Sequence, residues 1–367
     1  MKSKSISAAI LIIVMLLSAL ASCSSQTGGT ATESSKEPVT DDPTIAADTI
    51  TVTDDAKHEV TLTLPIERVA LLDTGPGTAL AALGKLDTVV GTHQALQNSL
   101  YGASANVPMV ATYAEINYEA LAETGPQLVL SATSHHGYVS ESDHLDDFGI
   151  QFIALDLRTP SRMRDDFRLL GKVFQAEAEA QRVIEFYDKY QNLIDERLAN
   201  VPEEERPTVF FEMHAGAFHT GSPESQFYQQ VELAGGRNIA FDLADNPSAD
   251  DTEVSAEWVA EKNPDYVLIE STALGTGYDS DSDAALFYDD FKARPGLAGV
   301  TAVKEDNIIM MGIDILSRPG YIVGVCYLAK EFYPELFADL DPAEVHREWY
   351  DIAFNGTNVE GIWTYTK

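Results

Sequence analysis

Polar and aromatic side chains follow several predicted strands of this chain. Ligands of open α/β proteins bind outside the carboxyl ends of the strands, so residues at these positions are binding candidates. A guanidinium binds carboxylate or hydroxamate oxygens through charge-assisted hydrogen bonds, and an aromatic ring stacks on a flat ligand. The ligand-binding candidates are Arg158, Arg318, Tyr113, Tyr118, His135, His136 and His214, beside which Asp73, Thr74, His93 and Asp314 also follow strands.

A direct metal site is an alternative use of the same positions. His93, His135, His214 and Asp314 each follow a predicted strand, two in each half of the chain. Three imidazoles and a carboxylate suit Zn²⁺ or Mn²⁺. These residues are isolated in the sequence, without the close paired spacing of common metal sites, so the sequence defines no firm metal-ligand set.

One sequence pattern occurs twice. Residues 117–130 read NYEALAETGPQLVL, and residues 255–268 read SAEWVAEKNPDYVL. Each copy predicts a short helix with an acid in its first turn, Glu119 or Glu257, then a helix stop, a proline and an apolar strand. A weaker echo precedes each copy. This order predicts two similar α/β lobes with a cleft between them.

The elements that position these residues alternate as in α/β proteins. Residues 49–63 predict a hairpin, and a stretch without Gly or Pro from about 176 to 200 predicts one long helix between the lobes. Other strands are expected at 68–73, 88–92, 127–132, 151–156, 208–213, 266–271 and 307–312. Other helices are expected at 77–84, 117–123, 139–147, 224–234, 255–262, 319–334 and 342–353. The predicted fold has an N-terminal lobe at 49–157, a connecting helical region at 158–200 and a C-terminal lobe at 201–367.

The first residues predict export and lipidation. Lys2 and Lys4 precede an apolar run too short to span a bilayer, which is typical of a signal peptide over residues 1–22. Leu20-Ala21-Ser22-Cys23 resembles the bacterial lipoprotein signal, in which the cysteine becomes lipidated. Residues 23–48 then comprise the lipidated Cys23 and a tether rich in Ser, Thr, Gly and acids.

Composition excludes several classes of partner. The formal net charge of −34 argues against nucleic acid and anionic lipid, because both select basic surfaces. A lipid at Cys23 is then the only expected link to the membrane. The chain has two cysteines, so Cys326, in an apolar run, is expected to be a buried small hydrophobe without a disulfide.

The ordered set of these segments resembles the iron-complex substrate-binding lipoproteins of ABC importers. The resemblance covers about 49–340 and includes RVALLD, NYEAL…PQLVL, the long helix, LAGGRNIA at 233–240 and VSAEWVAEKNPDYVLI at 254–269. It implies two lobes joined by a rigid helix, an extracytoplasmic location, no intrinsic cofactor, and delivery of a small-molecule metal chelate to an ABC permease dimer with its ATPase. In this family an acid on each lobe pairs with permease arginines, and the matching positions are Glu119 and Glu257. Residues 341–367 exceed the minimal family pattern and are expected to add a helix and a strand.

The ligand implied by the resemblance is an iron chelate, with a ferric siderophore first. Haem or a corrinoid such as cobalamin is the next alternative, for which His135 or His136 would supply an axial ligand, and direct Zn or Mn binding follows. An exported metal-dependent hydrolase is the alternative outside this class. The chain has no Gly-x-Ser-x-Gly or HExxH motif, and its partial dinucleotide fingerprint has Leu80 at the third glycine position. The sequence therefore predicts a binding protein that is not an enzyme.

Overall fold

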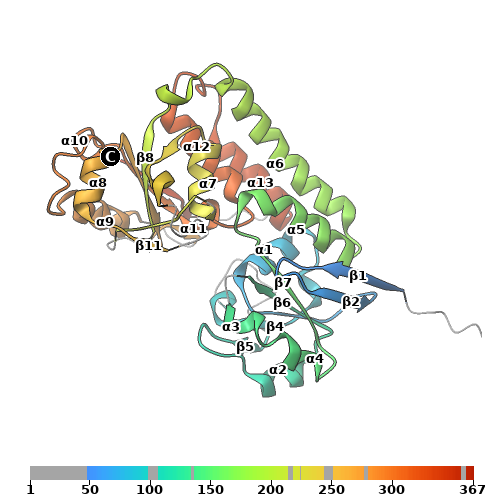
Figure 1. The fold of residues 1–367 in the computed structure, drawn as a ribbon. Helices are drawn as coiled ribbons and strands as arrows, with labels where there is room; N and C mark the ends of the chain where they lie inside the picture. The colour runs from blue at the N-terminus through green and yellow to red at the C-terminus, as the bar shows by residue number, and fades with distance from the viewer. Residues whose placement is uncertain are drawn as a thin grey trace, which may run out of the picture. The chain divides into compact units, whose positions relative to one another are not determined.

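Two parallel-stranded sheets organise the chain (Figure 1). The computed structural model describes residues 48–97, 106–133, 136–213, 218–223, 225–243, 251–276, 280–356 and 361–367. The signal peptide and almost all of the tether expected at 1–48 lie outside these residues. Among them, no helix has the length and apolar character needed to cross a membrane.

The first sheet has the strand order β5-β4-β3-β6-β7, and its strands are parallel. They are β3 (Val69–Leu71), β4 (Val89–His93), β5 (Met109–Ala111), β6 (Leu128–Ala132) and β7 (Gln151–Leu155). Between them lie α1 (Thr74–Ala82), η1 (Leu86–Thr88), η2 (Gln94–Leu96), α2 (Tyr118–Thr124), α3 (His136–Val139) and α4 (Ser142–Asp146). The expected hairpin is β1 (Thr49–Thr53) paired with β2 (Glu59–Thr63), and β2 contacts β7.

The second sheet has the order β10-β8-β12-β14-β16. Its strands are β8 (Thr208–Glu212), β10 (Arg237–Asn238), β12 (Tyr266–Ser271), β14 (Ile308–Gly312) and β16 (Thr364–Tyr365). All are parallel except β16, which pairs antiparallel with β14. The helices of this half are η4 (Glu203–Glu205), α7 (Gln226–Leu233), η5 (Ile239–Asp242), α8 (Ala256–Lys262), α9 (Ser282–Lys292), α10 (Thr301–Lys304), α11 (Ile313–Leu316) and α12 (Tyr321–Phe332). Two small pairs complete it: β9 (His219–Thr220) with β11 (Thr252–Glu253), and β13 (Gly275–Thr276) with β15 (Gly361–Ile362).

Three long helices pack together, and the longest of them joins the two lobes. They are α5 (Pro160–Val173), α6 (Glu177–Leu198) and α13 (Pro342–Phe354). At 1.5 Å per residue, the 22 residues of α6 span roughly 33 Å. Helix α6 contacts α5, α12 and α13, and α13 also contacts α1 of the first lobe (Figure 1). The predicted fold class, two similar α/β lobes joined by a single long helix, is confirmed, and α13 adds a second contact between the lobes.

One hydrophobic core runs through both lobes. It contains Leu130 of β6, Val183 of α6, Phe211 of β8 and Met311 of β14. Cys326 belongs to this core and is fully buried, as the sequence predicted, and burial raises the pKa of its thiol to about 12. The lobes therefore share apolar packing through the connecting helices.

The sequence prediction differs from the structure in a few elements. The helix expected at 139–147 is two short helices, α3 and α4, because the N–H of Glu141 donates to the carbonyl of Tyr138 in a tight turn between them. Several short elements were not expected: strands β5, β9, β10, β11 and β13 and helices α10 and α11. The longer helix α9 was not expected either. The additional C-terminal helix and strand are present as α13 and β16.

The burial of His346 on α13 predicts a pH dependence of stability. Its ring lies 4.5 Å from that of Tyr350 and 4.6 Å from that of Trp363. Burial lowers the pKa of His346 from 6.5 to about 4, so the folded protein holds the ring neutral where the unfolded chain protonates it. This contribution to stability is complete above pH 6.5 and is lost as the pH falls toward 4, by about 3 kcal/mol at most.

Urea unfolding of the wild type and of His346→Phe at pH 7.0, 6.0 and 5.0 measures this contribution. The wild type should lose more stability than the variant over this range, because carboxylates common to both proteins contribute equally. Parallel pH profiles of the two proteins would contradict a neutral buried imidazole.

Candidate functional site

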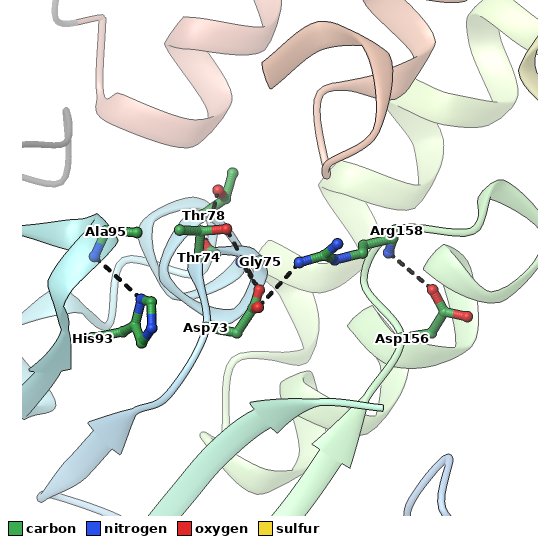
Figure 2. Close-up of polar contacts among 8 residues, drawn as sticks. All are labelled: Asp73, Thr74, Gly75, Thr78, His93, Ala95, Asp156 and Arg158. Atoms are coloured by element: carbon green, nitrogen blue, oxygen red, sulfur yellow. Dashed lines mark hydrogen bonds and ion pairs between the residues drawn. The ribbon is translucent and has the colours of Figure 1, made fainter. Parts of the chain in front are cut away.

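Asp73 and Arg158 form an ion pair at the carboxyl edge of the first sheet. Asp73 follows β3 and caps α1, its Oδ1 accepting a hydrogen bond from the Gly75 N–H at 2.9 Å. Arg158 follows β7, and its Nη2 lies 3.1 Å from the Asp73 Oδ2 (Figure 2). Asp73 is buried, whereas Arg158 is partly exposed. The pair therefore joins two strand ends and presents the guanidinium toward solvent.

The backbone before Arg158 is held in an unusual conformation. Leu157 has a φ of 45°, in the left-handed region. Its N–H donates to Asp166 at 2.7 Å, and the N–H groups of Arg158 and Thr159 donate to Asp156 Oδ1 at 3.1 and 2.7 Å. Burial and the neighbouring Asp55 carboxyl raise the pKa of Asp166. These hydrogen bonds fix the direction in which Arg158 leaves the chain.

His93 and Tyr113 lie together at the same edge of this sheet. His93 ends β4 and is buried, and its Nδ1 accepts a hydrogen bond from the Ala95 N–H at 3.1 Å (Figure 2). The ring of Tyr113 meets the imidazole edge-on at 4.6 Å and is 69% exposed. Tyr113 therefore presents an aromatic face to solvent, while His93 uses one ring nitrogen to hold the turn after β4.

The second sheet has two ion pairs at the carboxyl ends of its strands. Asp314 and Arg318 pair one helical turn apart after β14, and both remain partly exposed. Glu212, the last residue of β8, is fully buried, and its Oε2 lies 2.7 Å from the Arg294 Nη1. The Arg294 guanidinium also lies 4.9 Å from the ring of Phe218.

The sequence analysis did not single out Glu212 or Arg294. The sequence did contain one indication of this pair, because Glu212 is an acid at the end of the apolar strand TVFFE. A buried carboxylate requires a partner, and here the partner comes from a helix end far along the chain.

Each of the three arginines near these strand ends is thus compensated by a carboxylate. Arg158 pairs with Asp73, Arg294 with Glu212, and Arg318 with Asp314. Such pairs carry little net positive charge, so the described strand ends offer no cationic cluster for a highly charged anion. The arrangement suits a ligand with polar oxygens and low net charge.

The remaining predicted ligand-binding residues are Tyr118, His135, His136 and His214. Tyr118 begins α2 and donates to Glu141 Oε2 at 2.5 Å, so it lies on the helix of Glu119, apart from the pair of His93 and Tyr113. Burial and Glu141 raise the pKa of its phenol. His136 begins α3, where only its backbone is described, and His135 and His214 lie outside the described residues. Among those that are described, no three His, Cys, Asp or Glu side chains are grouped to hold a metal ion.

Helices α2 and α8 are equivalent in detail. Asn117 and Ser255 cap them, each accepting from the N–H three residues on, at 3.0 and 3.1 Å. Each helix has seven residues and ends at a left-handed residue, Gly125 or Asn263. Glu119 and Glu257 occupy the same exposed position of the first turn, where an acid favours the helix N-terminus. The repeat read from the sequence is therefore a structural repeat.

The chain belongs to the Periplasmic binding protein family, whose pattern matches residues 69–314. Proteins of this family are extracytoplasmic substrate-binding proteins, not enzymes; they carry no intrinsic cofactor and work with an ABC permease and its ATPase. Cobalamin-binding proteins from two Halobacterium salinarum strains are each 23% identical over 274 residues, which cover 74% of this chain and 70% of the relative.

Solved structures share the fold. The TroA-like periplasmic binding protein FepB of Veillonella parvula has a TM-score of 0.70 and 24% identity, covering 86% of this chain and 99% of that chain. MolA of Haemophilus influenzae, bound to molybdate, has a TM-score of 0.69 and 19% identity, covering 85% and 100%. CeuE of Helicobacter pylori, with Ni(II) bound, has a TM-score of 0.68 and 18% identity, covering 84% and 97%. One fold thus carries chemically different ligands.

The pairing of Arg158 with Asp73 predicts a measurable contribution to stability. Asp73→Asn retains a residue that caps a helix well but removes the charge facing Arg158, so it should lower the free energy of unfolding by about 1–2 kcal/mol. Asp73→Ala should cost more, because the cap of α1 is also lost. Asp165→Asn is the matched control, since Asp165 pairs with Arg168 at 2.6 Å on an exposed helix face. The control should change stability by less than about 0.5 kcal/mol in the same urea titration, and equal losses for Asp73→Asn and Asp165→Asn would contradict this role.

Proposed function

We propose that this binding protein captures a metal chelate of low net charge between its two lobes, with a corrinoid as the first candidate. The observation that carries the proposal is the compensation of Arg158, Arg294 and Arg318 by carboxylates. A corrinoid offers amide groups around its ring and needs no cationic cluster. The cobalamin-binding relatives support the same class of ligand.

A ferric siderophore of the hydroxamate type is the second candidate. Asp73 uses one N–H group of the Arg158 guanidinium, which has five donors and remains partly exposed. The other donors suit hydroxamate oxygens. The sequence alone favoured a siderophore over a corrinoid. We place the corrinoid first because the cobalamin-binding relatives support it, and because carboxylates at the strand ends disfavour a highly anionic siderophore.

Two further parts of the proposal concern delivery and location. Glu119 and Glu257 are the residues that dock on the permease dimer, one from each lobe. Their equivalent, exposed positions on α2 and α8 support this role. Cys23 carries a lipid that holds the protein at the outer face of the cytoplasmic membrane or on the periplasmic side. This assignment rests on the sequence at 20–23, which lies outside the described residues.

Ligand class is tested by calorimetric titration of residues 30–367 with cyanocobalamin, ferrioxamine B, ferric enterobactin and haemin. Cyanocobalamin should bind with 1:1 stoichiometry, and the trianionic ferric enterobactin should bind at least about 100-fold more weakly. Arg158→Ala should weaken cyanocobalamin binding by about 10-fold, since a charge-assisted hydrogen bond is lost. Arg162→Ala, on an exposed side chain of α5, is the control. Preferential binding of ferric enterobactin would overturn the low-charge proposal, and binding of ferrioxamine B without cyanocobalamin would select the second candidate.

Anchoring is tested by Cys23→Ala in cells. The variant should lack the lipid and should leave the membrane fraction or retain its signal peptide, because acyl chains are the expected link to the bilayer. Fractionation and mass spectrometry of the N-terminal peptide measure both outcomes. A processed Cys23→Ala protein that stays firmly in the membrane fraction would reject the lipid anchor.

A further inference from the structure

Each docking helix carries a matching aromatic group beside its acid. In the first lobe, the ring of Tyr118 lies 4.9 Å from that of His144, and His144 lies 5.2 Å from Phe148. We call Tyr118, His144 and Phe148 the first aromatic patch. It belongs to α2, α4 and the turn after α4.

The second lobe also has an aromatic group beside its acid, built from different elements and including the ion pair of Lys262 with Asp242. The Lys262 Nζ lies 5.5 Å from the ring of Trp258 and 4.9 Å from that of Phe241. Trp258, Lys262 and Phe241 form the second aromatic patch, on α8 and η5. In both patches an aromatic residue beside the docking acid contacts a nitrogen-bearing side chain, which contacts a phenylalanine.

The two phenylalanines are equally accessible. Phe148 and Phe241 are each 57% exposed. Single exposed apolar side chains are common on protein surfaces, so neither one alone indicates an interface. The occurrence of one such phenylalanine near each of the two equivalent acids is a stronger observation than either one alone.

The two acids have no partner among the residues that the structure describes. In the part of the chain that the structure describes, neither Glu119 nor Glu257 makes an ion pair or a side-chain hydrogen bond, and both are exposed. Two such carboxylates are complementary to a partner that presents two cations. Charged contacts accelerate and orient association, whereas buried aromatic contacts slow dissociation.

We infer that Phe148 and Phe241 are apolar anchors of a two-part docking surface, one part on each lobe, with Glu119 and Glu257 as its charged contacts. The partner is a permease dimer that offers one cation and one apolar recess in each half. This inference rests on the docking role given to the two acids above.

Binding to the permease–ATPase complex of the same import system, reconstituted in lipid nanodiscs, tests the inference. Phe148→Ser and Phe241→Ser should each raise Kd roughly 10-fold, mainly through faster dissociation, while the dependence on salt stays that of the wild type. Phe148→Leu and Phe241→Leu retain apolar area and should restore most of the affinity. Leu336→Ser is the control. Leu336 is 43% exposed, and its carbonyl accepts from Arg197 at the end of α6.

The double variant Glu119→Arg with Glu257→Arg tests the docking role of the acids separately from the role of the phenylalanine anchors. It should slow association and remove most of the salt dependence. If this variant binds as the wild type does, the docking role of both helices fails. If it loses binding while both Phe→Ser variants bind as tightly as Leu336→Ser, docking stands and the apolar anchors are overturned. Matching circular dichroism spectra and urea midpoints establish that the variants are folded.

Discussion

The packing around Tyr187 determines how the rest of the structure is arranged. Its side chain is fully buried on α6 and its hydroxyl donates to the Pro319 carbonyl at 2.7 Å. Its ring contacts Phe167 of α5, Tyr321 of α12 and Trp349 of α13. Burial raises the pKa of this phenol, so it remains a donor. One side chain thereby joins four helices that serve both sheets, and the strand-end residues keep their positions only if these helices hold.

Compensated arginines at a binding edge have a physical purpose. An unpaired guanidinium in a partly buried site would carry a desolvation cost, and a carboxylate partner reduces it while keeping the side chain in one orientation. Asp73 performs this function for Arg158 and also caps α1. The start of α1 and the orientation of the Arg158 guanidinium therefore depend on the same residue. The site is consequently preorganised, with hydrogen-bond donors available and little net charge.

Local patterns predicted a large part of this fold. The equivalent helices α2 and α8 could be predicted because the cap, the acid, the left-handed stop and the proline all lie within about ten residues. Helix α6 could be predicted from a run without Gly or Pro. Contacts between distant residues were not readable. Glu212 and Arg294 are 82 residues apart, and Asp73 and Arg158 are 85 apart, so no spacing rule connects them. Arg158 and Arg318 were predicted as strand-end residues. The partner of Arg318 lies only four residues away, but the partner of Arg158 depends on the folded backbone.

The contact between α1 and α13 has a consequence for how the chain reaches this structure. Helix α1 begins at Thr74 and α13 begins at Pro342, so one of the most distant segments in sequence covers the first lobe. Closing so long a loop is entropically unfavourable and slow, and contacts of high sequence separation generally form late in folding. A chain emerging from its amino end would assemble the first sheet with part of α1 still open to solvent. Completion of that lobe is therefore coupled to completion of the other.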